Sequence, residues 1–294
     1  MKDTQVKDEQ LKDTCTKTTQ TEDEQKKGRA ATKSRNYEED LKRLQSLRPI
    51  DDDFMRCIFK NNLSLAQKVL RIILDKPDLK LVKAETQADM KRLLGARSIC
   101  LDALGEDDNG KMYDLEIQRD DKGADPHRAR YHSSVMDVEN LDASEAFDTL
   151  PDTYVIFITE NDIYDEGLPV YPIERMNILL DKPFADGEHI LYVNGAYRGD
   201  DEIGKLMHDF SCADPDEMID KDMAEVTRYY KESEKGVSKM CKVFDEIREE
   251  GREEGRIDIA LELIAMGVIS YEDIAKATKL SLEEVKQLAE GVPA

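Results

Sequence analysis

A short turn between two apolar strands constrains the fold of this chain more than any other feature. Residues 98–118 contain two strand-like runs separated by Asp108-Asn109-Gly110. A two-residue loop made of Asn109 and Gly110 would mix polar and apolar side chains on each face of the hairpin. A three-residue loop, with Gly110 in the left-handed conformation of a bulge, separates polar from apolar faces. We therefore predict the three-residue loop.

This register brings acidic side chains together. Asp102 lies opposite Glu116, and Asp114 and Gln118 share their face of the hairpin. Directly opposed carboxylates repel each other at this spacing. A Mg²⁺ ion prefers oxygen ligands and would offset that repulsion, activate a water and stabilise charge on a phosphate. The alternative is a solvated polar face on a half-exposed hairpin.

A predicted helix after the hairpin carries basic and aromatic side chains. Asp125-Pro126 is a typical helix start, with aspartate as the N-cap and proline at the first helical position. Arg128, Tyr131 and His132 follow at helical spacing, so they share one face. Arg128 or Arg130 can hold a phosphate, or can instead form a structural ion pair with the abundant carboxylates. The four histidines are too scattered to predict a zinc site.

The order of these residues resembles the PD-(D/E)XK nuclease superfamily. More narrowly, residues 48–242 resemble the bacterial PD-(D/E)XK nuclease family transposases, also described as recombination-promoting nucleases. The resemblance rests on Asp102, on Glu116-Ile117-Gln118 and on the stretch from His127 to Tyr131. Supporting stretches are Asp51 to Met55, Gly95 to Ser98, Arg128 to Ser134, Tyr154 to Glu160 and Tyr192 to Tyr197.

The resemblance implies a role for each of these residues. Asp102 and Glu116 would bind Mg²⁺ or Mn²⁺, and Gln118 stands where a lysine commonly positions or activates the attacking water. Glutamine can only orient a water by hydrogen bonding. Asp53 and Glu85 either support the metal site or lie on the surface. The expected contacts with DNA phosphate are Arg128, Arg130 and Tyr131.

The resemblance also implies a fold: an α/β (α+β), restriction-endonuclease-like domain with an αβββαβ core, in which helices flank a mixed central sheet. The hydrophobic pattern agrees independently. Residues 53–74 have the spacing of a helix, residues 80–84 predict a strand, and residues 154–159 form a continuous apolar run suited to a buried strand.

We expect three parts along the chain. Residues 1–46, rich in Lys, Asp, Thr and Gln, predict a charged tail that is disordered or at most a solvated helix, and residues 47–245 are expected to form the nuclease-like domain. Residues 246–294 predict a helical tail in which Ser270 and Ser281 each begin a helix, an arrangement that resembles a helix-turn-helix. Because its last helix is acidic, the tail favours self-association or partner binding over reading DNA.

Composition sets limits on partners and location. The net charge of -22 and the isoelectric point of about 4.7 are unusual for a DNA-binding protein, so affinity for DNA should be modest and salt-sensitive. Five cysteines without paired spacing, no signal peptide and no apolar span of membrane length predict a cytoplasmic, thiol-reduced protein. The basic residues expected around the site, besides those on the predicted helix, are Lys83, Lys91, Arg92, Arg97, Lys111, Arg119 and Lys122.

The leading functional prediction is a metal-dependent DNA endonuclease of a mobile-element or recombination type. Its expected partner is DNA, with no membrane and no small-molecule cofactor. Because double-strand cleavage by a one-site nuclease calls for two active sites, we expect a homodimer. The alternative is a catalytically inactive nuclease fold that acts as a DNA-binding or assembly module, as Gln118, the acidic charge and the helical tail suggest.

Overall fold

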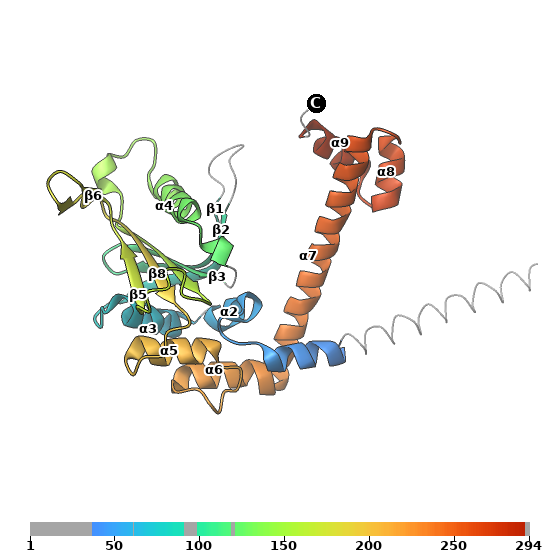
Figure 1. Ribbon diagram of the computed structural model, residues 1–294. Coiled ribbons are helices and arrows are strands. Elements are labelled where there is room, and N and C mark those ends of the chain that lie inside the picture. The colour runs from blue at the N-terminus through green and yellow to red at the C-terminus, as the bar shows by residue number, and fades with distance from the viewer. Residues whose placement is uncertain (1–36, 61, 91–98, 119–120, 292–294) are drawn as a thin grey trace, which may run out of the picture. The chain divides into compact units, whose positions relative to one another are not determined.

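The computed structural model describes residues 37–60, 62–90, 99–118 and 121–291 (Figure 1). The side chains of residues 86–102 and 119–122 lie outside this description. Internal contacts divide the chain into two units. Residues 42–237 form the sheet unit, and residues 238–294 together with the segment up to residue 41 form the helical unit. The sequence had predicted a boundary after residue 245 instead.

A six-stranded mixed sheet forms the centre of the sheet unit. β1, β2 and β3 are antiparallel, β3, β4 and β8 run parallel, and β5 closes the edge antiparallel to β8. Together with the flanking helices, this sheet confirms the predicted α/β architecture. In sheet order the strands are β1 (Leu81–Met90), β2 (Ile99–Asp107), β3 (Met112–Gln118), β4 (Thr153–Thr159), β8 (Glu188–Asn194) and β5 (Val170–Ile173).

The β2–β3 hairpin has the predicted register. Ala103 pairs with Leu115, and the Asp107 amide donates to the Lys111 carbonyl at 3.0 Å. Gly110 has a φ of 78°, the left-handed conformation that a side chain would strain. The three-residue loop is therefore confirmed.

The predicted first helix is two helices. The sequence had predicted one helix over residues 53–74, whereas α2 (Asp52–Phe59) ends at Lys60 and α3 (Leu63–Leu74) begins after Asn62. The Asn62 side chain accepts a hydrogen bond from the Leu65 amide and so caps the second helix. The apolar spacing continues through the break, which explains why it suggested a single helix.

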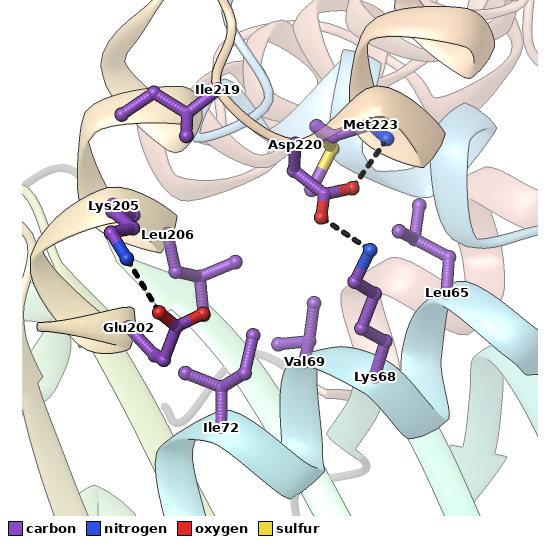
Figure 2. Close-up of a pocket in the computed structure, with 10 residues that line it drawn as sticks. All are labelled: Leu65, Lys68, Val69, Ile72, Glu202, Lys205, Leu206, Ile219, Asp220 and Met223. Atoms are coloured by element: carbon purple, nitrogen blue, oxygen red, sulfur yellow. Dashed lines mark hydrogen bonds and ion pairs between the residues drawn. The ribbon is translucent and has the colours of Figure 1, made fainter.

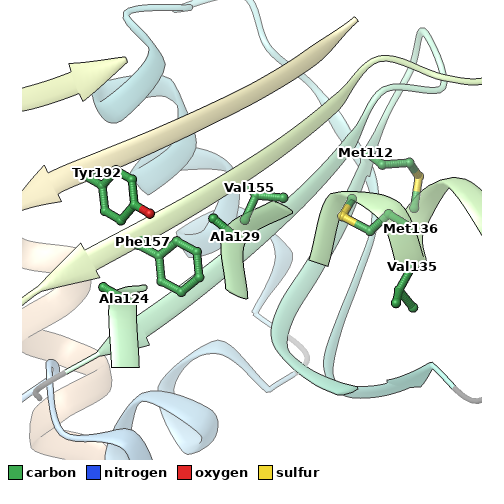
Figure 3. Close-up of a cluster of buried hydrophobic side chains, with 8 residues drawn as sticks. All are labelled: Met112, Ala124, Ala129, Val135, Met136, Val155, Phe157 and Tyr192. Atoms are coloured by element: carbon green, nitrogen blue, oxygen red, sulfur yellow. The ribbon is translucent and has the colours of Figure 1, made fainter. Parts of the chain in front are cut away.

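Helices cover both faces of the sheet. Figure 1 shows α4 (Pro126–Asn140) on one face and α3, α5 (Glu202–Ser211) and α6 (Lys221–Glu232) on the other. Under α4 lies a core of buried side chains drawn in Figure 3: Met112, Ala124, Ala129, Val135, Met136, Val155, Phe157 and Tyr192. Because side chains alternate along a strand, Asp114 and Glu116 fall on the same face of β3 as Met112.

The remaining elements of the sheet unit are short. Two 3₁₀ turns, η1 (Asp121–Ala124) and η2 (Phe147–Thr149), flank α4 in sequence. A small hairpin of β6 (Met176–Asn177) and β7 (Lys182–Pro183) lies between β5 and β8 along the chain.

The helical unit contains α8 (Tyr271–Thr278), α9 (Leu282–Glu290) and most of α7 (Glu234–Met266). Gly267, with a φ of 63°, ends α7 as predicted. Ser270 and Ser281 are both N-caps, and Ser281 forms the full reciprocal capping box. Ala260, Ile274, Leu280 and Val285 are buried together in the core of this unit.

Part of the tail that was predicted as disordered or as a solvated helix is helical. Residues 37–46 are helical, and the Leu44 side chain is completely buried. Asp40 receives two hydrogen bonds from Arg248, at 2.6 and 2.8 Å. Residues 1–36 lie outside the described residues. Within the described part of the chain, no helix has both the length and the apolar character needed to cross a membrane.

Candidate functional site

Two carboxylates are buried side by side on β3. Asp114 and Glu116 are both 0 % exposed, and they share one face of β3 because they are two residues apart on the strand. That face is directed at α4, whose side chains bond to both of them. Their neighbours on β4 are the apolar residues Val155 and Phe157. Burying charge in such surroundings costs several kcal/mol unless the charge is paired, so the cations and donors around these groups decide the character of the site.

His132 of α4 bonds to the first carboxylate. Its Nδ1 lies 2.9 Å from Oδ2 of Asp114 and 3.9 Å from Oε1 of Glu116, and its ring is 2 % exposed. On its other side, Nε2 lies 3.3 Å from Nε of Arg128. A guanidinium only donates, so Nε2 accepts and Nδ1 carries the proton donated to Asp114.

Arg128, one helical turn before His132, pairs with the second carboxylate. Its Nη2 donates to Oε2 of Glu116 at 3.0 Å, and its Nη1 donates to Oε1 of Gln118 at 3.1 Å. The same Nη1 also reaches the Gly123 carbonyl at 3.3 Å. Because the Arg128 side chain is 40 % exposed, the guanidinium lies between the buried carboxylate and solvent.

The cluster has a donor set suited to a divalent cation. Ligand atoms of Asp114, Glu116 and His132 lie within 4.8 Å of one another, and no other such trio of His, Cys, Asp or Glu occurs among the residues that the structure describes. Among the contacts of the described residues, these two carboxylates face the guanidinium of Arg128. Carboxylate oxygens suit Mg²⁺ and Mn²⁺. An imidazole nitrogen would add affinity for transition metals, but His132 would first have to release its bond to Asp114 or to Arg128.

The structure brings together only part of the predicted site. Arg128 of α4 bonds to Glu116 and Gln118 of β3, as expected from the predicted inward face of the helix and polar face of the strand. Asp102 lies in β2 next to Ala103, whose partner is Leu115, but the Asp102 side chain is outside the described part. The register therefore places the predicted pairing of Asp102 with Glu116 one residue beyond the last recorded pair.

The two predicted supporting carboxylates have other partners. Asp53 accepts from Arg43 at 2.5 Å, and Glu85 pairs with Lys83 at 3.0 Å while remaining half exposed. Neither belongs to the buried cluster. Asp52, the residue before Asp53, lies near Arg128. Burial raises the pKa of Asp52, and the positive charge of Arg128 opposes that rise.

The predicted phosphate-binding residues on α4 separate onto different faces. Arg130 is exposed, and Tyr131 packs against the core under the helix. Arg128 forms the structural ion pair that the sequence had left as the alternative to phosphate contact. Among the basic residues expected around the site, Lys83 pairs with Glu85 and Lys111 pairs with Asp152 at 2.6 Å.

Sequence reasoning missed His132 as a site residue, because only a zinc constellation of histidines had been considered. The available signal was its position one turn after Arg128, on the face directed at Asp114 and Glu116. Asp114 had been placed on the correct face but was given no role.

A cavity of about 240 Å³ lies on the other side of the sheet, between α3, α5 and the start of α6 (Figure 2). Its walls are mainly aliphatic, including Val69, Ile72 and Leu206. Its two lysines are already paired with carboxylates, Lys68 with Asp220 and Lys205 with Glu202. The cavity therefore offers shape but no converging polar groups for catalysis.

Comparison with known proteins leaves the chain unassigned. No protein-family model, no curated protein and no solved structure matches it. The likeness to PD-(D/E)XK nucleases therefore stays a prediction from the sequence.

Proposed function

We propose that the chain is a metal-dependent nuclease that hydrolyses phosphodiester bonds in DNA, on a restriction-endonuclease-like variant of the α/β fold. The observation that carries the proposal is the buried cluster of Asp114, Glu116 and His132, with Arg128 and Gln118 at its rim. An apolar core would be more stable without two buried carboxylates, so a role in chemistry explains their presence better than a role in packing.

The carboxylates would hold the metal. Glu116 and Asp114, together with Asp102 on the neighbouring strand, are the ligands expected for Mg²⁺ or Mn²⁺. When bound, such an ion supplies an acidified water and neutralises charge on a phosphate. His132 donates to Asp114 and so fixes the orientation of that carboxylate.

Gln118 and Arg128 act at the rim. The Gln118 amide oxygen accepts from Arg128, and the amide nitrogen can orient a water by donation. Arg128 offers a partly exposed guanidinium, a side chain that can hold a phosphate with two parallel hydrogen bonds. Four of its five N–H groups already donate within the cluster, so a phosphate bound in this way would displace one of those contacts. Because the whole chain carries a charge of -22, we expect weak and salt-sensitive affinity for DNA.

The test is cleavage of supercoiled plasmid by the purified chain in Mg²⁺, in Mn²⁺ and in EDTA. We expect nicked or linear product with either metal, none in EDTA, and at least a 100-fold slower rate for Glu116→Gln. Glu85→Gln is the matched control, because it removes a carboxylate that is exposed and lies outside the cluster. Equal rates for wild type and Glu116→Gln would refute the proposed site.

A second candidate is an inactive nuclease fold that binds DNA or assembles with other chains. It is favoured by one observation: Arg128 already neutralises Glu116 and already occupies the Gln118 oxygen. Isothermal titration with MnCl₂ separates the two candidates. Heat of binding that disappears in Glu116→Gln supports the nuclease, whereas a folded wild type that binds DNA without binding metal supports the inactive module.

A further inference from the structure

The hairpin of β6 and β7 exposes an unusual set of large apolar side chains. Residues 176–184, here named the apolar arm, hold only two recorded strand pairs, Met176 with Pro183 and Asn177 with Lys182. Figure 1 shows β6 projecting beyond the end of the sheet. The exposed fractions are 89 % for Ile178, 95 % for Leu179, 64 % for Leu180, 63 % for Phe184 and 45 % for Met176.

Ion pairs and a hydrogen bond hold the base of the arm, whereas the apolar side chains at its tip are exposed to solvent. Arg175 forms ion pairs with Asp186, at 3.0 Å, and with Glu188, and the Phe184 amide donates to the Arg175 carbonyl at 2.8 Å. An isolated two-stranded hairpin is marginally stable in water, and soluble monomers rarely expose contiguous apolar patches above a few hundred Å². The arm therefore has the properties of a surface that another molecule covers.

The charge distribution favours a second copy of the chain as the partner. The chain carries a net charge of -22, so two copies repel each other across most of their surfaces. The apolar arm contains one acidic residue, Asp181, and one basic residue, Lys182, and is electrically neutral. In a two-fold arrangement these adjacent opposite charges can pair with their counterparts on a second arm. The arm is thus a place where two copies of this acidic chain can meet without repulsion.

The exposed apolar area is smaller than that of a standard stable interface, so we expect the dimer to be weak. Five large side chains expose on the order of several hundred Å², and a standard stable interface needs about 800 Å² per partner. The adjoining edge strand β5 adds Ile173, which is 42 % exposed. Pro172 in that strand has no N–H, which disfavours extension of the sheet by a second β5, so the contact would be made by side chains.

We propose that the apolar arm is a homodimer contact, packed in the dimer against the arm of a second copy. The inference is independent of catalysis, because it depends on exposure and charge and not on the carboxylate cluster.

Sedimentation equilibrium of the full chain between 1 and 100 µM tests the proposal. We expect wild type to approach twice 33.6 kDa, with tighter association at 0.5 M than at 0.05 M NaCl because salt screens the repulsion. The double substitution Ile178→Asp and Leu179→Asp should raise the dissociation constant at least 100-fold. Phe147→Asp, at a residue that is 82 % exposed outside the arm, should change it less than 3-fold.

A second measurement locates the contact. Benzoylphenylalanine incorporated at Leu179 should cross-link residues 176–184 to the same segment of another copy, as identified by mass spectrometry. A wild type that is monomeric at 100 µM would overturn the proposal, as would a dimer unaffected by the double substitution, which would place self-association elsewhere. Flotation of monomeric wild type with phosphatidylcholine vesicles, lost in the double variant, would assign the arm to a lipid surface and also overturn it.

Discussion

Replacing Arg128 with methionine should destabilise β3 by removing the cation that balances a buried carboxylate. Methionine keeps much of the aliphatic volume of arginine, so the main change is the loss of the guanidinium. Glu116, which is 0 % exposed, then loses the donor at 3.0 Å. Gln118 loses its bond to Nη1 at 3.1 Å in the same substitution.

The expected magnitude follows from the distance and the exposure. Two unit charges 3.0 Å apart attract with a gross energy of about 5 kcal/mol at an effective dielectric constant of about 20. Arg128 is 40 % exposed, and solvent screening reduces the net effect of its removal to about 2–3 kcal/mol. In a double-mutant cycle with Glu116→Gln, the two substitutions should show a coupling energy of about 1.5–2.5 kcal/mol.

Native-state hydrogen exchange in increasing urea, with peptides resolved by mass spectrometry, is the appropriate assay. It reports the opening free energy of β3 itself, which global unfolding of a chain with two units does not isolate. Arg130→Met is the matched control, because this arginine is exposed on the same helix, and it should change the opening free energy by less than 0.5 kcal/mol. A coupling energy below about 0.5 kcal/mol would refute the view that Arg128 neutralises Glu116.

Four further predictions concern single positions. Gly123→Ala should lower the cleavage rate at least 10-fold with little loss of stability, because a Cβ there would overlap the Gln118 amide and displace it. A plasmid assay measures the rate, and thermal unfolding followed by circular dichroism measures the stability. Burial raises the pKa of Tyr192 from 10 to about 12, so its ionisation costs the folded state nothing below pH 10 and lowers the free energy of unfolding increasingly as the pH rises to about 12. Tyr192→Phe should therefore unfold at a higher pH than wild type in a titration followed by circular dichroism, and identical midpoints would contradict this. Lys231→Met should lower the free energy of unfolding by about 3 kcal/mol in urea, because the buried ammonium donates to three backbone carbonyls that would lose their donor. Ser281→Ala should destabilise α9 by about 1 kcal/mol, measurable as faster exchange of its first-turn amides, and unchanged exchange would show that the cap contributes little.

Local rules predicted much of this fold. The turn at Gly110 made the hairpin register predictable. With a left-handed glycine and alternating side chains, only one register places polar residues on one face and apolar residues on the other. The helix starts at Asp125, Ser270 and Ser281 were predicted for the same reason, since a capping side chain acts on amides two or three residues away. The break at Asn62 had such a signal too, but the apolar period that continues through it obscured the cap.

The sequence by itself determined which side chains share the polar face of β3 and the inward face of α4, because those periodicities belong to single elements. Only the tertiary structure decided which of them bond. Arg128 meets Glu116 instead of solvent, His132 meets Asp114, and Asp53 and Glu85 pair elsewhere, because these contacts depend on how helices and strands pack. The solvent exposure of Leu179 could not be predicted from the sequence either, because an apolar run predicts burial. Periodicity acts within a turn or a strand, whereas ion pairing and burial are set by packing between segments that local sequence does not encode.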